Sequence, residues 1–365
     1  MTGSGSERSY NLARYEGWKE RFERPRRSKP AELSMAQVGA LGRRELLLYN
    51  EERSVWHANL GPYLTPDMLD VIDQLELIVQ SNRQDGDRVR SSAVIDAFPG
   101  LGKTTLAVHY AGQFHRDQIE MYGPTTDSGD DRIPVSYVRL TSNTTMRSLN
   151  SMLCHFYAHP AADRGNATVL GARASQRALD SETRLIVIDD VHFLDMRRQD
   201  GREVANHFKW LANEFAATFL FVGVGIQERG LLTEGLSPTR VQFAQTARRW
   251  TRMSLSPFGI GDAQGRRTWR RLLLAIERDI VLANKVPGMI ADDLADYLFA
   301  RSTGHFASLM TLLVRGCQRA VKSGEESLTA ALLDTVKNDD ASEKSRRQLD
   351  ASLRSGRLSA GAAAG

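Results

Sequence analysis

Short apolar runs alternate with longer helical stretches over residues 92–255. Runs of aliphatic, aromatic and β-branched residues predict strands at residues 93–97, 134–140, 184–188, 218–224 and 251–255. Residues 158–174 are rich in Gly, Ala, Arg and Asp, which predicts an irregular loop. Alternating strands and helices are typical of a parallel sheet covered by helices, so the pattern predicts an α/β fold.

Helical patterns lie on both sides of the predicted sheet. Residues 41–48 and 65–81 precede it, and the second of these helices begins at Thr65-Pro66 with Asp67 in its first turn. Beyond residue 257 the pattern predicts only helices, at residues 264–282, 290–300, 306–321 and 327–336. We therefore expect an α/β domain with a helical preface over residues 41–257 and a small all-helical lid domain over residues 258–337.

Both ends of the chain are polar. Residues 1–40 are expected to form a partly disordered N-terminal arm, in which aromatic residues recur at helical spacing and predict a short amphipathic helix that docks on the rest. These aromatic residues are Tyr10, Tyr15, Trp18 and Phe22. Residues 338–365 finish in Ser, Gly and Ala and are expected to be a disordered tail.

Composition narrows the class of protein. Of the 365 residues, 41% are hydrophobic and 25% are charged, which excludes collagen-like and wholly disordered chains. The only cysteines, Cys154 and Cys317, build neither a disulfide framework nor a zinc cluster, so a reducing cytoplasm is the simplest location. The most apolar run, residues 215–226, is too short to cross a bilayer, and no membrane partner is expected.

The charge is mildly basic and unevenly spread. The net charge is +4, and 40 Arg outnumber 8 Lys, an excess that a GC-rich genome would also produce. Residues 238–271 carry eight Arg and one acid, whereas residues 51–90 carry four Arg and eight acids. Because Arg binds phosphate with a planar fork, this segregation favours a surface that meets a polyanion or an acidic neighbour.

A glycine-rich loop follows the first predicted strand and precedes a predicted helix. Its sequence, Ala97-Phe98-Pro99-Gly100-Leu101-Gly102-Lys103-Thr104, matches the phosphate-binding pattern G-x-x-x-x-G-K-T except at the first position. Glycines let the backbone curl around a phosphate and point its N–H groups inward at a helix start. We predict that ATP is held here, with Lys103 at the β and γ phosphates and the Thr104 hydroxyl on Mg²⁺. The predicted contact residues are Pro99, Gly100, Leu101, Gly102, Lys103, Thr104 and Thr105.

Two carboxylates, Asp189 and Asp190, follow the apolar strand at residues 184–188. Open parallel sheets bind ligands at the carboxyl ends of their strands. We predict that Asp189 holds Mg²⁺ through a water and that Asp190 orients or deprotonates the attacking water. Asp is shorter than the Glu more usual at the second position, so slow hydrolysis is expected unless the water shifts. An ordinary acidic turn after a buried strand is the alternative interpretation.

Two further sets of residues are candidates for function. Arg249, with Arg248 as the alternate, precedes the last predicted strand and is expected to stabilise transition-state charge on a nucleotide in a neighbouring subunit. A solvated basic face is the other interpretation. Asn143, Thr144 and Arg147 follow the second predicted strand and carry groups that bond phosphate oxygens, which makes them candidate DNA contacts. A helix cap followed by polar residues explains the same segment at least as well.

Together these motifs resemble those of the AAA+ superfamily, and within it the transposon-encoded ATPase helper subunits called TniB-like or TnsC-like, with the MuB type more distant. The similarity spans residues 41–333. Its elements are the P-loop, the I-D-D-V-H-F-L run at residues 188–194, the F-L-F-V-G-V-G strand, the Q-T-A-R-R-W box and Thr303-Gly304-His305-Phe306 in the lid. The resemblance implies an ATP-dependent DNA binder that forms a ring or helical filament on duplex target DNA. Its implied partners are a transposase, which it recruits or stimulates, and a target-selector protein.

Two features of that family are missing. The strand at residues 219–224 is expected between the two motif strands, and its end usually carries a polar residue that touches the attacking water. Here the end reads Val222-Gly223-Val224. The lid has Ala307 and Ser308 where many relatives place a nucleotide-contacting Arg. A regulator that uses ATP mainly as an assembly switch tolerates both departures.

Other functions share part of this pattern. A nucleotide-switched signalling or defence ATPase that acts on a protein effector without DNA is the main alternative. An initiator-like or clamp-loader-like AAA+ protein usually carries a DNA-reading module after the lid, where only residues 338–365 are expected to remain. A small-molecule kinase shares the P-loop but would need an acceptor site.

Overall fold

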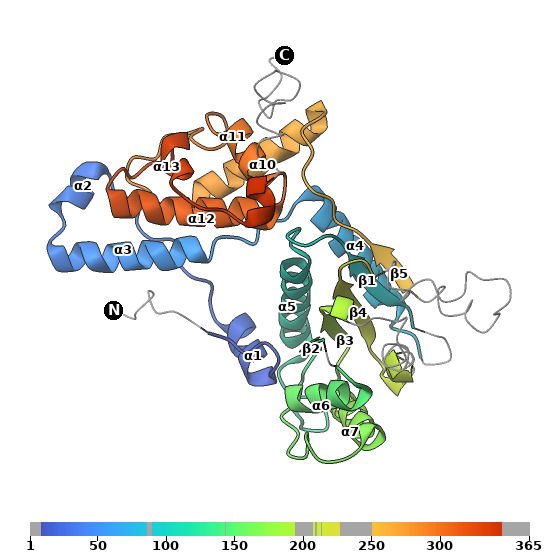
Figure 1. Cartoon of the computed structure of the whole chain (residues 1–365). Helices are drawn as coiled ribbons and strands as arrows, with labels where there is room; N and C mark the ends of the chain where they lie inside the picture. The colour runs from blue at the N-terminus through green and yellow to red at the C-terminus, as the bar shows by residue number, and fades with distance from the viewer. Residues whose placement is uncertain are drawn as a thin grey trace.

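A computed structural model of the chain describes residues 9–85, 90–142, 144–193, 207–208, 210–212, 214–226 and 250–344. Its centre is a sheet of five parallel strands in the spatial order β2-β3-β4-β1-β5 (Figure 1). The strands are β1 (Ser92–Asp96), β2 (Val135–Arg139), β3 (Leu185–Asp189), β4 (Thr218–Gly223) and β5 (Trp250–Met253). The predicted α/β fold is confirmed, and β4 lies between the two motif strands as expected.

The strands could be located in the sequence because most of them are buried on both faces. All residues of β1, β3 and β4 are buried, so each strand reads as a continuous apolar run. β5 lies at the edge of the sheet, and its central residues, Thr251 and Arg252, are exposed. It ends at Met253 rather than at residue 255, because its pairing with β1 stops there.

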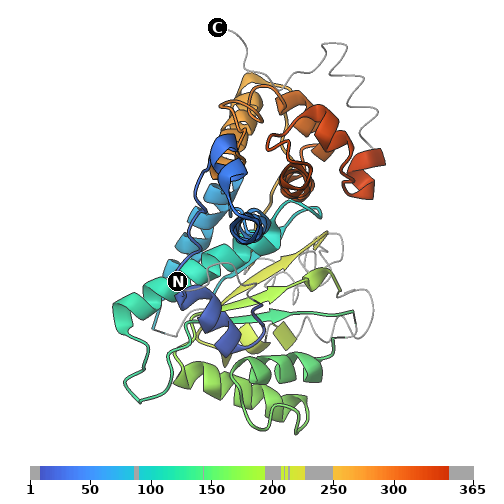
Figure 2. The same ribbon diagram turned by 90° about the vertical axis from the view of Figure 1, so that its left-hand side faces the viewer.

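Helices cover both faces of the sheet (Figure 2). On one face α5 (Lys103–Tyr122) crosses β2, β3 and β4, and α1 (Tyr15–Glu23) packs against α5. α4 (Pro66–Ser81) packs beside β1. α6 (Met146–Phe156) and α7 (Ala167–Asp180) lie together on the other face. None of the helices in the described ranges is both long and apolar enough to span a bilayer.

The prediction of an irregular loop over residues 158–174 is wrong in its second half, where α7 begins at Ala167. Asn166 caps this helix, because its side chain accepts a backbone hydrogen bond of 3.0 Å from the first turn. A Cβ at Gly171 would lie 2.8 Å from Asn150 Nδ2 of α6. The small residues that indicated a loop therefore let α6 and α7 approach closely. The buried face of α7 includes Leu170, Ala174 and Ala178.

The C-terminal region is helical, as predicted, and has a hydrophobic core of its own. It contains α10 (Ala263–Asp279), α11 (Ala295–Ser302), α12 (Phe306–Ser323) and α13 (Ala330–Asp334). α10 and α11 are shorter than predicted, because the segment between them wraps around the buried carboxylate of Glu277. This carboxylate accepts the N–H groups of Gly288 and Ile290 at 2.7 and 2.9 Å. We call this region the lid; the domain boundaries stay predictions.

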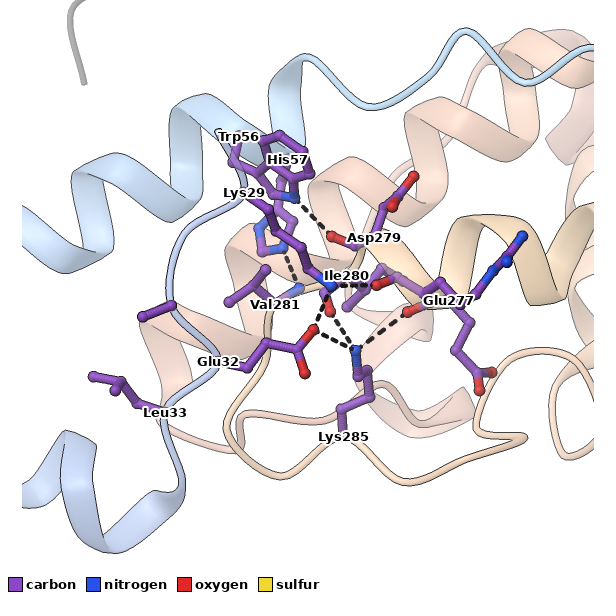
Figure 3. A network of polar contacts seen from close by, with 12 residues as sticks. Lys29, Glu32, Leu33, Trp56, His57, Glu277, Asp279, Ile280, Val281 and Lys285 are labelled. Atoms are coloured by element: carbon purple, nitrogen blue, oxygen red, sulfur yellow. Dashed lines mark hydrogen bonds and ion pairs between the residues drawn. The ribbon is translucent and has the colours of Figure 1, made fainter. Parts of the chain in front are cut away.

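The N-terminal segment packs on both regions. Trp18 of α1 is fully buried in the core of the α/β region, as expected for a docked amphipathic helix. α2 (Met35–Ala40) and α3 (Arg43–Ala58) instead lie beside the lid (Figure 1). α3 extends beyond the predicted end at residue 48 because its second half contacts the lid (Figure 3). The Trp56 indole donates to the Asp279 carbonyl at 2.6 Å, and the His57 ring accepts the Val281 N–H at 3.0 Å.

Candidate nucleotide-binding site

The loop between β1 and α5 has the shape needed to surround an anion. Gly100 and Gly102 have φ angles of 79° and 86°, in the left-handed region that favours glycine. A Cβ at Gly102 would also lie only 2.8 Å from Met68 Cε. α5 begins directly after this turn, and the N–H groups of a first helical turn have no carbonyl partners within the helix. The backbone of residues 99–105 therefore offers several donors to one bound anion.

The amine of Lys103 lies inside this loop. Its Nζ donates to the Phe98 carbonyl at 2.8 Å. Burial lowers the pKa of Lys103, and the carboxylates of Asp189, Asp96 and Asp190 act in the opposite direction. A phosphate bound in the loop would replace the carbonyl as the partner of this amine.

The second predicted motif meets the loop. Thr104 Oγ1 donates to Asp189 Oδ1 at 3.3 Å, although the two residues are 85 positions apart in the chain. Asp189 is only 1% exposed, and its Oδ1 also accepts the N–H of Asp190 at 2.8 Å. The hydroxyl and the carboxylate that the sequence predicts as Mg²⁺ ligands are therefore neighbours.

Two residues of β2 that the sequence analysis did not single out contact these carboxylates. Tyr137 donates its hydroxyl to Asp189 Oδ2 at 2.7 Å. Arg139 Nε lies 3.1 Å from Asp190 Oδ2, and the Arg139 guanidinium lies 3.6 Å from Asp189 Oδ2. β2 pairs directly with β3, with Arg139 opposite Asp189. In the sequence, Arg139 is a polar residue at the carboxyl end of a strand. Its contact with the acids can be inferred only when the order of the strands in the sheet is known.

These donors and acceptors suit a triphosphate with magnesium. Mg²⁺ prefers oxygen ligands and usually shares them with substrate phosphates. No group of three or more His, Cys, Asp and Glu side chains within the described ranges could hold a metal by itself. Thr104 and Asp189 would hold Mg²⁺ together with phosphate oxygens, and the loop N–H groups and Lys103 would hold the phosphates.

Two hollows that share lining residues lie near the start of α4. A cavity of about 470 Å³ lies between the start of α4 and the segment that leads into α10. Thr65, Asp67, Ser256 and Phe258 line both this cavity and a smaller hollow that reaches Leu101 of the loop. The two sides of this surface lie far apart in the chain, so no local pattern in the sequence indicates it. A larger cavity of about 690 Å³ lies at the opposite end of the sheet, between α4 and the second half of α5.

The lid contacts the phosphate-binding loop directly. The N–H of Ala307, in the first turn of α12, donates to the Gly100 carbonyl at 2.9 Å. Ser308 is buried. The lid thus meets the loop through its main chain at the position where many AAA+ proteins are expected to place an arginine.

The other predicted residues are not part of this cluster. Thr144 is 7% exposed, and its hydroxyl donates to the Thr141 carbonyl at 2.9 Å. The Arg147 guanidinium donates to the carbonyls of Asp163 and Gly165 at 2.7 and 3.0 Å. These contacts favour the helix-cap interpretation of this segment over a DNA contact. Three predicted residues lie outside the described ranges, namely Asn143, Arg248 and Arg249.

The chain has a five-stranded parallel sheet in this order, with a P-loop after β1 and an acidic pair at the end of β3. A helical region follows the sheet in the chain. Together these features define the P-loop AAA+ fold. A protein-family model described as an AAA domain matches residues 87–232, which include both motifs. A search of curated proteins found no match.

Several solved structures share the fold. The Orc1 protein of Aeropyrum pernix in complex with DNA matches with a TM-score of 0.55 and 14% identity, over 81% of this chain and 69% of that chain. The ORC2 protein of the same organism, as ADPNP-ADP complexes, matches with a TM-score of 0.54 and 14% identity, over 82% and 74%. Cdc6p from Pyrobaculum aerophilum matches with a TM-score of 0.51 and 16% identity, over 75% and 67%. At such identities the likeness shows the fold alone.

Proposed function

We propose that this protein is an ATP-dependent, DNA-binding regulator of DNA transposition that oligomerises on target DNA and recruits or stimulates a transposase. The observation that carries the proposal is the contact between Thr104 in the P-loop and Asp189 at the end of β3. It joins the two motifs with which P-loop ATPases bind a triphosphate and its metal.

The phosphates of ATP bind in the loop between β1 and α5. The N–H groups at the start of α5 and the positive end of the helix dipole stabilise their charge. Lys103 adds an ammonium group, and a phosphate beside it favours the charged form of this buried amine. Mg²⁺ at Thr104 and Asp189 supplies further neutralisation of phosphate charge when it is bound.

Asp190 is the candidate group for orienting or deprotonating the attacking water. Its Oδ2 lies 3.1 Å from Arg139 Nε, so the ion pair competes with water for one oxygen of this carboxylate. A short carboxylate in an ion pair favours slow turnover, which suits a protein that uses ATP as an assembly switch. Arg249 of a neighbouring subunit would stabilise charge that develops on the phosphates.

Three observations support DNA as a partner. The sequence motifs resemble those of transposon-encoded ATPases, and one protein of similar fold, Orc1, was solved in complex with DNA. The basic stretch noted in the sequence also continues into α10, whose first half carries four exposed or half-buried arginines: Arg266, Arg267, Arg270 and Arg271. The oligomer, the transposase and a target-selector protein as partners are supported by the resemblance alone.

Electron microscopy of the purified protein with duplex DNA tests the proposal. We expect regular assemblies on DNA with ATP and Mg²⁺ but not with ADP or without nucleotide. Lys103→Ala should lose these assemblies, and Lys322→Ala, which changes an exposed lysine of α12, is the matched control. If the protein bound ATP but no DNA at low salt with any nucleotide, the signalling ATPase would be the better description. If calorimetry detected no uptake of ATP with Mg²⁺ by folded protein, the whole proposal would fail.

A further inference from the structure

We propose that Tyr137 is a positioning residue for Asp189, and that Trp18 of the N-terminal helix holds Tyr137 in that role. The inference rests on the proposed function, because Asp189 is the carboxylate that would hold Mg²⁺. It makes α1, which precedes the AAA+ motifs in the chain, part of the structure that sets the geometry of the nucleotide site.

Tyr137 and Asp189 share a buried hydrogen bond. The tyrosine Oη and the aspartate Oδ2 are 2.7 Å apart, and the two residues are 4% and 1% exposed. The register of β2 on β3 places Tyr137 opposite Val187 and Arg139 opposite Asp189, so all four side chains lie on one face of the sheet. The hydroxyl is the donor of this hydrogen bond, because an ionised carboxylate can only accept.

This hydrogen bond sets the direction of the carboxylate. Oδ2 of Asp189 is bonded to Tyr137, while Oδ1 is bonded to Thr104 of the P-loop at 3.3 Å and to the N–H of Asp190 at 2.8 Å. A carboxylate held at both oxygens cannot turn without breaking a bond, so Oδ1 stays directed at the P-loop. Arg139 is a weaker holder, because it lies 3.6 Å from Oδ2 and 55% of its side chain is exposed.

α1 covers the ring of Tyr137. Trp18 is fully buried, and its ring stacks on that of Tyr137 with the centroids 5.8 Å apart and an interplanar angle of 24°. Phe22, one turn later, packs on Trp18 with the ring centroids 4.5 Å apart. A Cβ at Gly112 of α5 would lie 2.1 Å from the Phe22 ring, so this glycine lets α1 approach α5 closely. The stacked rings therefore pack against the ring of Tyr137, whose hydroxyl is bonded to Asp189.

A role in core packing alone would explain the ring of Tyr137 but not its hydroxyl. A phenylalanine would fill the same space against Trp18, whereas the hydroxyl meets a buried carboxylate that needs donors. The change that separates the two roles is therefore Tyr137→Phe. Tyr157→Phe is the matched control, because Tyr157 is also buried and donates its hydroxyl to Thr183 Oγ1 at 3.0 Å, near the amino ends of β2 and β3.

The first measurement needs no nucleotide. A double-mutant cycle combines each tyrosine change with Asp189→Ala and compares the equilibrium constants of unfolding in urea. We expect Tyr137→Phe and Asp189→Ala to be coupled by a factor of roughly ten or more, and Tyr157→Phe and Asp189→Ala to be additive.

The second measurement follows the Mg²⁺ dependence. Tyr137→Phe should bind ATP in EDTA as the wild type does, but should need roughly tenfold more Mg²⁺ for half-maximal ATP turnover. Trp18→Ala should shift the Mg²⁺ dependence in the same direction, and Trp18→Phe, which keeps a ring against Tyr137, should restore most of it. A Tyr137→Phe protein that matched Tyr157→Phe in both measurements would overturn the inference. A wild-type protein that took up no ATP would refute the proposed function, and this inference with it. If Tyr137→Phe and Asp189→Ala were still coupled in unfolding, the hydrogen bond would be present and only the nucleotide-binding role would have failed.

Discussion

The ion pair between Arg53 of α3 and Glu326 after α12 joins the N-terminal segment to the lid. Arg53 makes two hydrogen bonds to the Glu326 carboxylate, of 2.6 and 2.9 Å, and the two side chains are 0% and 5% exposed. The same carboxylate accepts the Ala283 N–H at 3.0 Å. Arg53→Met keeps much of the side-chain volume but leaves a buried carboxylate without its cation. We expect this change to lower the free energy of unfolding by about 3–5 kcal/mol.

Urea unfolding followed by tryptophan fluorescence measures this loss, because Trp56 bonds to the lid and Trp269 lies in its core. The control is Arg53→Met combined with Glu326→Gln, which leaves no buried charge and should therefore be more stable than Arg53→Met alone. A deficit below about 0.5 kcal/mol, the range of ordinary surface changes, or a double variant no more stable than the single one, would show the reasoning to be wrong.

Three further predictions concern the nucleotide site and α3. Lys103→Ala should raise the dissociation constant of ATP at least about tenfold in calorimetry, because the phosphates lose a charge-assisted partner. Arg139→Ala should raise ATP turnover by no more than about fivefold, because the half-exposed pair with Asp190 contributes about 1 kcal/mol or less; a fall in turnover would contradict this. Burial lowers the pKa of His57 from 6.5 to about 4, so stability should be full above pH 6.5 and fall as the pH drops towards 4. His57→Gln keeps an acceptor for the Val281 N–H and should flatten this fall in the urea midpoint; an unchanged slope would exclude His57 as its source.

The sheet and the centre of the site could be predicted from the sequence for a physical reason. Parallel strands covered by helices on both faces are apolar throughout, so β1, β3 and β4 are visible as runs without alternation. The carboxyl ends of such strands share one edge of the sheet, which brings the P-loop after β1 towards the acids at the end of β3. The hydrogen bond of 3.3 Å between Thr104 and Asp189 is consistent with these two rules. Their roles toward ATP and Mg²⁺ stay predictions.

The parts of the site that escaped prediction depend on placement between distant segments. The contact of Ala307 with Gly100 requires the lid to be docked on the loop, and the hollow at Thr65 and Ser256 requires the preface to lie beside the end of β5. Neither arrangement leaves a periodic pattern in the chain. The first half of α7 was not predicted for a different reason. Gly171 is unfavourable in an isolated helix, but here it allows close contact with α6.

Tyr137 shows why a residue near a site can stay hidden in a well-predicted strand. An aromatic residue in an apolar strand is expected for the core alone, so nothing in the local sequence separates Tyr137 from its neighbours Val135 and Val138. Two features of the fold distinguish Tyr137 from these valines. The register of β2 on β3 brings its hydroxyl to a buried carboxylate, and Trp18 of α1 packs on its ring. A buried tyrosine hydroxyl bonded to a charged group is costly to desolvate unless the bond is kept, so its position is set by Asp189 as much as by packing. Removing one oxygen atom from Tyr137 is therefore expected to change both the unfolding equilibrium and the Mg²⁺ dependence of ATP turnover.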